Sequence, residues 1–314
     1  MRGNGLSGSG RADAAGSWLR GLAWASAVGL FVVILMGTTV TDTGSELGCG
    51  RSWPLCHGRL LPGPALHTLV EFSHRAVAGL VGLLVVAVAV WAWRRHGRNL
   101  EVRVLALLSA GFVWVQALLG AAAVMWPQAP AVLALHFGFS LIALASAVLL
   151  AARLGERGGG PGVPPAARGV RLLALGLVLY TYALVYLGAF VAHTGSGLGC
   201  LGWPLCGGAL VPRLAGATLL AFGHRAVAAG LVLLLLGFRI RVGHLTQPRP
   251  DLVRAANLEL VAVLAQAGSG ALLVLSRLAT GALLLHATLV SLLFSAVAYG
   301  YWLTLRGHVP AVVP

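Results

Sequence analysis

Four histidines lie where this residue is unusual, inside long apolar segments of the chain. They are His74, His136, His224 and His286. An ionisable side chain in such a segment is costly and commonly marks a functional site. Imidazole nitrogen is a good ligand for iron, zinc and copper, so these residues suggest metal or cofactor binding. A lone histidine could simply hydrogen-bond a neighbouring helix, whereas four regularly placed ones favour ligation.

The four histidines form two equally spaced pairs. His74 and His136 are 62 residues apart, as are His224 and His286. Each lies some six to eight residues into its segment, which places all four about 8–12 Å below the same ends of their helices. Two imidazoles at one depth in a four-helix bundle suit bis-histidine heme ligation. Zinc or copper is the alternative, but it needs further ligands at that depth, and only Glu71 is available.

Glu71 distinguishes the two pairs. It precedes His74 by three residues, so both side chains project from one helix face, and the second half has Ala221 at the equivalent position. A carboxylate beside one pair indicates chemistry needing an acid, a base or charge stabilisation in the first half, and an electron carrier in the second. Alternatively, Glu71 only pairs with Arg75, four residues later.

Four further polar residues are candidates for cofactor contact. Arg75 and Arg225 directly follow the first histidine of each half. They could pair with heme propionates or extend towards the membrane surface. Gln116 and Gln266 lie in the middle of apolar segments, where an amide should point inward, either to a macrocycle or to another helix.

The four cysteines form two close pairs, Cys49 with Cys56 and Cys200 with Cys206, each around a W-P-L triplet in a glycine-rich segment. The spacings C-x6-C and C-x5-C do not match common zinc sites. The pattern predicts a loop-closing disulfide in each half. A redox-active pair next to the heme site is the alternative, since exposed disulfides can be labile.

The elements that position these residues are membrane-spanning helices. The 314 residues are 58% hydrophobic and 10% charged, whereas soluble domains carry about a quarter charged residues. Each of eight apolar runs reaches the ~20 residues that a spanning helix needs. They lie at about 18–40, 67–93, 102–125, 131–152, 171–192, 216–238, 255–276 and 281–305. The sequence predicts an all-α integral membrane protein with the lipid bilayer as its solvent.

The chain contains two copies of one four-helix unit. LGCGRSWPLCHG at 47–58 returns as LGCLGWPLCGG at 198–208, and EFSHRAVAGL at 71–80 returns as AFGHRAVAAG at 221–230. An even number of helices gives both units the same orientation. The repeat therefore predicts two parallel four-helix bundles related by a pseudo-two-fold axis along the membrane normal, not an inverted repeat. Residues with an identical partner 150 positions later include Trp53, Pro54, Leu55, Cys56, His74, Gln116, Gly120 and His136.

This repeat predicts five parts of the chain. The Gly/Pro segment GERGGGPGVPPAARG at 155–169 separates the halves. The parts are a disordered cytoplasmic N-terminus (1–17), an N-terminal bundle (18–153), a cytoplasmic linker (154–170), a C-terminal bundle (171–305) and a cytoplasmic tail (306–314).

The arginines predict the orientation. The net charge of +14 comes from arginine alone, since the chain has no lysine. The N-terminus, the links after the second, fourth and sixth runs and the C-tail carry sixteen arginines, and the opposite side carries four. By the positive-inside rule both termini are cytoplasmic and the cysteine loops lie outside, in an oxidising compartment. Because these arginines sit in short links, nucleic acid is not a predicted partner.

Taken together, these residues resemble the heme A synthase family. The resemblance rests on TGSELGCGRSWPLCHG at 43–58, EFSHR at 71–75, Gln116 with Gly120, and His136, and on their second-half counterparts, including TGSGLGC at 194–200. It covers nearly the whole chain apart from the N-terminus, and the combined signature is specific. One departure is Glu46, where the second repeat has Gly197.

The resemblance implies a bacterial plasma-membrane enzyme in the assembly of heme-copper oxidases. It would oxidise the C8 methyl of heme O to a formyl group by successive monooxygenation, giving heme A. In the first half His74 and His136 would hold the substrate heme and Glu71 would be catalytic. In the second half His224 and His286 would ligate heme B. The cysteine pairs would be the outer-loop disulfides.

The resemblance also suggests contact with heme O synthase and a homo-oligomer, while no residue identifies the electron donor. Two different classes of function remain open. One is a diheme electron-transfer cytochrome, which has no special need for Glu71. The other is a heme transporter or chaperone, in which the same histidines bind heme transiently.

Overall fold

The computed structural model of the chain describes residues 6–126, 129–156 and 164–307, and its regular secondary structure in these ranges is α-helical. All eight helices are long and apolar enough to cross a membrane. The predicted all-α, multi-pass membrane fold is confirmed. The helices are α1 (Leu6–Asp42), α2 (Leu66–His96), α3 (Leu100–Met125), α4 (Pro130–Gly155), α5 (Arg168–His193), α6 (Gly216–Gly243), α7 (Pro250–Leu275) and α8 (Thr280–Thr304).

Local sequence signals explain several helix ends. Proline occupies the first position of α4 and α7, where its missing N–H costs no hydrogen bond. The side chain of Asn99 caps α3 by accepting a hydrogen bond of 3.2 Å from the Val102 N–H.

Helix α1 begins before the predicted membrane-spanning run. It starts at Leu6, within the segment 1–17 for which the sequence predicted disorder. No proline interrupts the chain from there to the membrane span, and extending an existing helix adds one hydrogen bond per residue fixed. Residues 1–5, most of the predicted linker (157–163) and most of the tail (308–314) lie outside the described residues.

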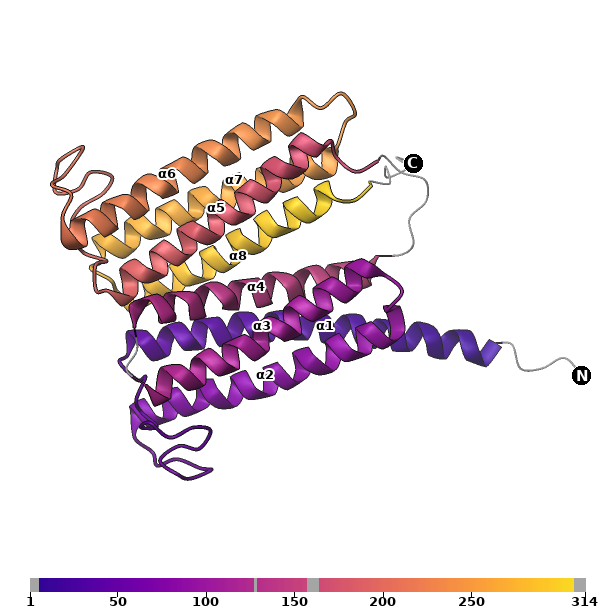
Figure 1. The fold of residues 1–314 in the computed structure, drawn as a ribbon, viewed down its shortest axis with the longest axis horizontal. Coiled ribbons are helices and arrows are strands. Elements are labelled where there is room, and N and C mark those ends of the chain that lie inside the picture. Colours follow the sequence, from indigo (N-terminus) through magenta and orange to yellow (C-terminus); the bar gives the residue numbers. More distant parts are fainter. Residues whose placement is uncertain (1–5, 127–128, 157–163, 308–314) are drawn as a thin grey trace, which may run out of the picture.

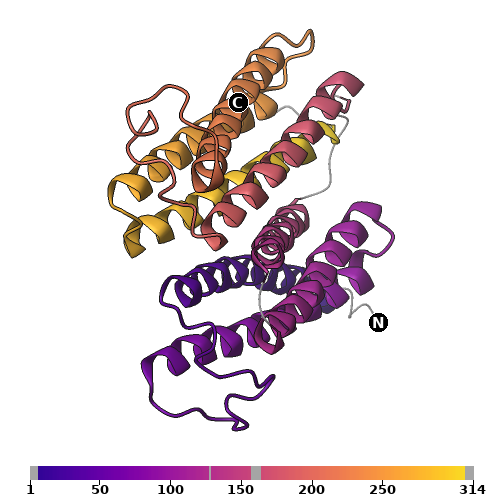
Figure 2. The ribbon, with the colours of Figure 1, turned by 60° about the vertical axis from the view of Figure 1, so that its left-hand side comes forward.

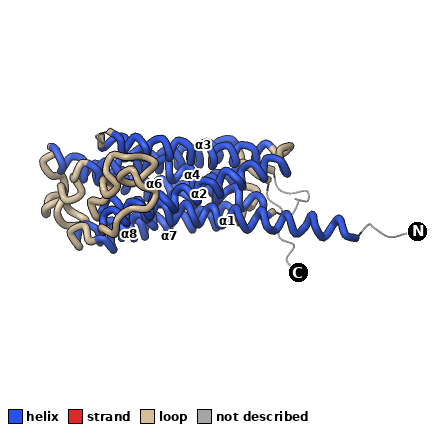
Figure 3. Tube along the Cα trace, turned by 90° about the horizontal axis from the view of Figure 1, so that it is seen from below, coloured by secondary structure: helices blue, strands red, loops and turns tan. Residues whose placement is uncertain are grey.

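Helices α1–α4 form one bundle and α5–α8 a second, and the two lie side by side (Figure 1). Turning the molecule keeps the two groups separate, with α4 and α5 at their boundary (Figure 2). All helix axes run roughly along one direction (Figure 3), and the loops between α1 and α2 and between α5 and α6, which contain the cysteines, lie at the same end (Figure 1). This arrangement fits the parallel repeat, because an inverted repeat would place the two loops at opposite ends.

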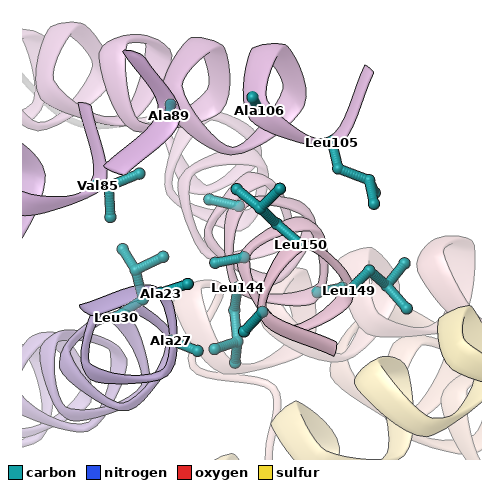
Figure 4. Packing of buried hydrophobic residues seen from close by; sticks show 14 of the residues in the cluster. Ala23, Ala27, Leu30, Val85, Ala89, Leu105, Ala106, Leu144, Leu149 and Leu150 are labelled. Carbon is teal, nitrogen blue, oxygen red and sulfur yellow. The ribbon is translucent and has the colours of Figure 1, made fainter. Parts of the chain in front are cut away.

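Small side chains let the helices of the first bundle approach closely. The buried cluster in Figure 4 joins Ala23 and Ala27 of α1, Val85 of α2, and Leu144 and Leu150 of α4. Membrane helices associate through such close packing because lipid tails are as apolar as leucine. Close packing of apolar side chains thus holds the core of this bundle together, so its buried polar residues are available for other roles.

Helix α4 joins the two bundles by packing against α5 and α8, and α1 also packs against α8. Tyr182 of α5 lies between Phe139 of α4 and Phe294 of α8, with ring centroids 6.4 and 6.2 Å away. Aromatic pairs at such separations stabilise a contact beyond the effect of burying their apolar area.

A polar junction joins the bundles at the end opposite the cysteine loops. Glu101 of α3 accepts a hydrogen bond of 2.7 Å from Arg153 Nε and another from Trp302 Nε1 of α8. Arg306, just after α8, approaches Glu101 to 3.3 Å. One carboxylate therefore binds residues from both halves.

Candidate heme-binding sites

The four histidines lie at equivalent places on the four even-numbered helices. His74 and His224 follow the first residues of α2 and α6 by eight positions, and His136 and His286 follow those of α4 and α8 by six. Within each half the two helices that carry these histidines belong to one four-helix bundle, and both histidines lie near the end of the bundle that carries the cysteine loop. The structure therefore brings together the residues that the sequence paired.

Each imidazole rests against a glycine of a neighbouring odd-numbered helix. A Cβ added to any of these glycines would lie close to the Cε1 atom of the ring, so the missing side chain makes room beside the imidazole. The pairs are Gly37 with His74 (3.2 Å), Gly120 with His136 (3.6 Å), Gly188 with His224 (2.8 Å) and Gly270 with His286 (3.4 Å). Sequence reasoning missed Gly37 and Gly188, although they share the 151-residue offset of the preceding loops.

Several buried polar atoms at these sites have no hydrogen-bond partner within the described part of the chain. They are Nδ1 of His74, His136 and His224, both polar atoms of the Gln116 amide, and Oε1 of Gln266. Buried polar atoms are normally satisfied, so a group of unsatisfied ones around paired imidazoles indicates a ligand site.

Heme fits this donor set. A porphyrin would itself supply four nitrogens to the iron, so each half would need to add only its two imidazoles. A zinc site needs at least three protein ligands, and no cluster of three or more His, Cys, Asp or Glu side chains suited to a metal ion occurs among the described residues. Two-histidine sites lined by glycine therefore match heme better than a bare metal ion.

Glu71 is buried beside His74, with 3% of its surface exposed. Its Oε2 accepts a hydrogen bond of 2.7 Å from the Cys49 backbone N–H, and its Oε1 accepts one from Arg75. The i,i+4 ion pair that the sequence left as an alternative is thus present. The contact with Cys49 also ties the carboxylate to the cysteine loop.

Both arginines beside the histidines are engaged by the cysteine loops. Arg75 donates to the carbonyl of Ser52 at 2.9 Å as well as to Glu71. Arg225 donates to the carbonyls of Cys200 and Gly202 at 2.6 and 3.0 Å. Their predicted contact with a cofactor stays a prediction.

Both predicted disulfides are present, Cys49–Cys56 and Cys200–Cys206. All four cysteines are buried, with at most 7% of their surface exposed. Loop closure is therefore confirmed, whereas the redox-active alternative stays a prediction.

His286 differs from the other three histidines in its neighbours on α7. Its Nδ1 lies 2.9 Å from Ser269 Oγ, and its Nε2 lies 3.1 Å from the Gln266 amide nitrogen. Gln266 thus makes the helix–helix contact that was one of its two predicted roles.

Residues 64–298 match the family model described as cytochrome oxidase assembly protein, COX15-CtaA. The chain belongs to this family. The matched range contains Glu71 and all four histidines, so the COX15-CtaA match covers both candidate heme sites.

Relatives named heme A synthase match this chain over most of their length. The one from Shouchella clausii is 40% identical over 92% of this chain and 97% of its own. The one from Symbiobacterium thermophilum is 42% identical over 91% of this chain and 95% of its own. The one from Halalkalibacterium halodurans is 39% identical over 87% of this chain and 93% of its own. The predicted family is confirmed.

Sequence reasoning missed a second buried carboxyl in this COX15-CtaA chain. Glu259 of α7 is 1% exposed, its Oε2 has no hydrogen-bond partner in the described ranges, and its Oε1 occupies the space beside Gly300 of α8. The first half has Ser109 and Leu150 at these positions. An acidic residue inside an apolar run is the signal that could have found it.

Proposed function

We propose that the chain is a heme A synthase, which oxidises the C8 methyl of heme O to a formyl group and yields heme A. The observation that carries this function is a buried carboxylate, Glu71, beside only one of two equivalent histidine pairs. Relatives named heme A synthase, aligned over most of both chains, support the choice of substrate.

In this proposal the two halves hold different hemes. His74 and His136 hold the substrate, heme O, next to Glu71. His224 and His286 hold heme B as a resident cofactor, with Ala221 in place of the carboxylate. Bound there, heme B supplies one-electron transfer. Gln116 and Gln266 line the two sites, one in each half.

Converting a methyl to a formyl group by two successive monooxygenations places two hydroxyls on that carbon; each step uses one O2 and two electrons from the donor and releases one water, and the resulting gem-diol loses a further water to leave one C=O bond. Glu71 is the group that accepts the hydroxyl proton as the carbonyl forms. The Cys49 N–H and Arg75 hold its two oxygens in place, so the carboxylate needs no reorganisation during the reaction. The apolar helix packing around the site keeps bulk water away from the reacting carbon.

The enzyme works in the bacterial plasma membrane with both termini in the cytoplasm. The sixteen arginines of the N-terminus, the alternate links and the C-tail support this orientation. The disulfides suit an outer, oxidising side for the cysteine loops. Heme O synthase supplies the substrate, an electron donor of unknown identity serves the resident heme, and the chain assembles as a homo-oligomer.

Heme chromatography on membranes tests this function. Cells expressing the chain with a source of heme O are expected to accumulate heme A. Glu71→Gln should lower its formation by about 10²–10⁴-fold, as loss of a general base does, while the bound heme content stays unchanged. Ala221→Glu, the matched change in the other half, should leave heme A formation intact.

Only heme B and unconverted heme O, extracted from folded protein, would contradict the proposal. Two equal heme B groups per chain would then indicate an electron-transfer cytochrome. Normal heme A formation by Glu71→Gln would instead remove Glu71 from catalysis.

A further inference from the structure

The hydrogen bonds around Ser269 fix which nitrogen of His286 carries the hydrogen. The Ser269 hydroxyl donates to the Gln266 backbone carbonyl at 2.8 Å, and its oxygen lies 2.9 Å from His286 Nδ1. A hydroxyl has one hydrogen and a carbonyl can only accept, so Oγ must accept from Nδ1–H. The lone pair of His286 is therefore on Nε2.

The second contact of His286 agrees with this tautomer. The side-chain nitrogen of Gln266 carries only hydrogens to donate, and it lies 3.1 Å from His286 Nε2 and 3.3 Å from Nδ1, which already carries the hydrogen donated to Ser269. Nε2 must then be the acceptor. Nε2 is thus the nitrogen whose lone pair would bind iron in place of the Gln266 amide.

No other histidine of the two sites has such support. The Nδ1 atoms of His74, His136 and His224 are buried without a partner among the described residues. The counterpart of Ser269 in the first half is Leu119, which has no polar side-chain atom to offer His136. The two halves therefore differ at the second histidine of each pair, independently of Glu71.

We propose that Ser269 is a positioning residue that makes His286 a permanent iron ligand, while Leu119 leaves His136 an exchangeable one. A hydrogen bond at Nδ1–H orients a ligating imidazole and raises its basicity, and losing such a partner typically costs 10–100-fold in metal affinity. This inference rests on the proposed function: the cofactor heme must stay through many turnovers, whereas the product heme must leave.

Heme transfer from the purified full-length protein to excess apomyoglobin tests the role of Ser269. Ser269→Ala is expected to release heme B about 10–100-fold faster than the wild type, and Ser269→Thr, which keeps the hydroxyl, should restore slow release. A less basic His286 also stabilises ferric iron less, so the midpoint potential of that heme should rise. Each tenfold loss of ferric over ferrous affinity corresponds to about 59 mV.

The matched change in the first half gives the converse result. Leu119→Ser should slow release of the heme bound by His74 and His136, and Leu119→Ala should not. If Ser269→Ala merely loosened the fold, heme release would be faster but Ser269→Thr would not restore slow release. The midpoint potential of the heme would then not change together with the release rate.

Equal release rates and midpoint potentials in Ser269→Ala and the wild type would overturn the inference, even in a protein that forms heme A. A wild-type chain that forms no heme A would overturn the proposed function instead. Faster heme loss from Ser269→Ala in that protein would still support the role of Ser269.

Discussion

Arg75 and Arg225 show how one contact was adapted to two purposes. Each guanidinium reaches from its helix to carbonyl groups of the cysteine loop above it. In the first half Glu71 is inserted between the arginine and the backbone N–H of Cys49. A contact that secures the loop in the second half thus also orients a carboxylate in the first.

This contact predicts a difference between two equivalent arginine substitutions. Arg75→Ala leaves Glu71 buried without its ion-pair partner, which typically costs 3–5 kcal/mol for a buried pair. We expect lower thermal stability and strongly reduced heme A formation. Arg225→Ala, the matched control, removes loop contacts but leaves no carboxylate without its partner, and should retain more activity than Arg75→Ala. Thermal unfolding and heme chromatography check both variants, and equal activity in the two would contradict the positioning role of Arg75.

The histidines and the glutamate of the site could be predicted from the sequence, but the small residues that contact them could not. Histidine and glutamate stand out in apolar segments because burying them is costly. Gly37, Gly188 and Ser269 do not, since small residues are common throughout membrane helices. Their roles depend on which side chain of a neighbouring helix faces them, and hydropathy carries no such information.

At the scale of helices, hydropathy predicted the apolar part of each helix but not the residues at which the helix begins and ends. The predicted run at 18–40 lies inside α1, which extends back to Leu6 because polar and small residues continue the helix beyond the apolar part. Similarly, α6 continues to Gly243, past the predicted end at residue 238. An apolar run reports contact with lipid, whereas a helix ends only where its backbone hydrogen bonding stops.

The glycine contacts predict which glycine of α5 is needed for heme binding. In Gly188→Ala the new Cβ would lie 2.8 Å from His224 Cε1 and push the ring aside. Overpacking of this kind costs about 1–3 kcal/mol, and we expect loss of the heme held by His224. Gly176→Ala on the same helix meets no atom within 4 Å and should bind heme normally. Absorbance of purified protein measures the difference, and full heme content in Gly188→Ala would contradict the contact.

The facing residues Glu259 and Gly300 predict a coupled pair between α7 and α8. Gly300→Leu alone should destabilise the protein by about 1–3 kcal/mol, because the leucine would occupy the space of the Glu259 carboxyl. Combining it with Glu259→Ser recreates the Ser109–Leu150 pair of the first half and should recover most of this loss. Thermal unfolding of the two single variants and the double variant measures the coupling, and purely additive effects would argue against direct contact.

At the scale of the whole molecule, the parallel repeat places both histidine pairs near the end that carries the cysteine loops. Electron transfer between the proposed heme B and heme O would then run along the membrane plane. Moving a charge fully across the membrane involves about 2.3 kcal/mol per 100 mV, and transfer at constant depth avoids this term. A duplication with preserved orientation therefore suits a cofactor and a substrate that exchange electrons. An inverted repeat would place the two sites at opposite depths.

The division of labour between the halves predicts different losses on removing equivalent histidines. In cells without heme O, the wild type should contain about one heme B per chain, held by two axial histidines. His224→Ala should lose most of it, while His74→Ala, the matched change in the first half, should keep it. When a heme O source is added, His74→Ala should fail to retain a second heme and should form no heme A. Pigment extraction from purified protein measures both quantities. If His74→Ala lost heme B as fully as His224→Ala, the two sites would be equivalent, and the asymmetry set by Glu71 and Ser269 would not separate cofactor from substrate.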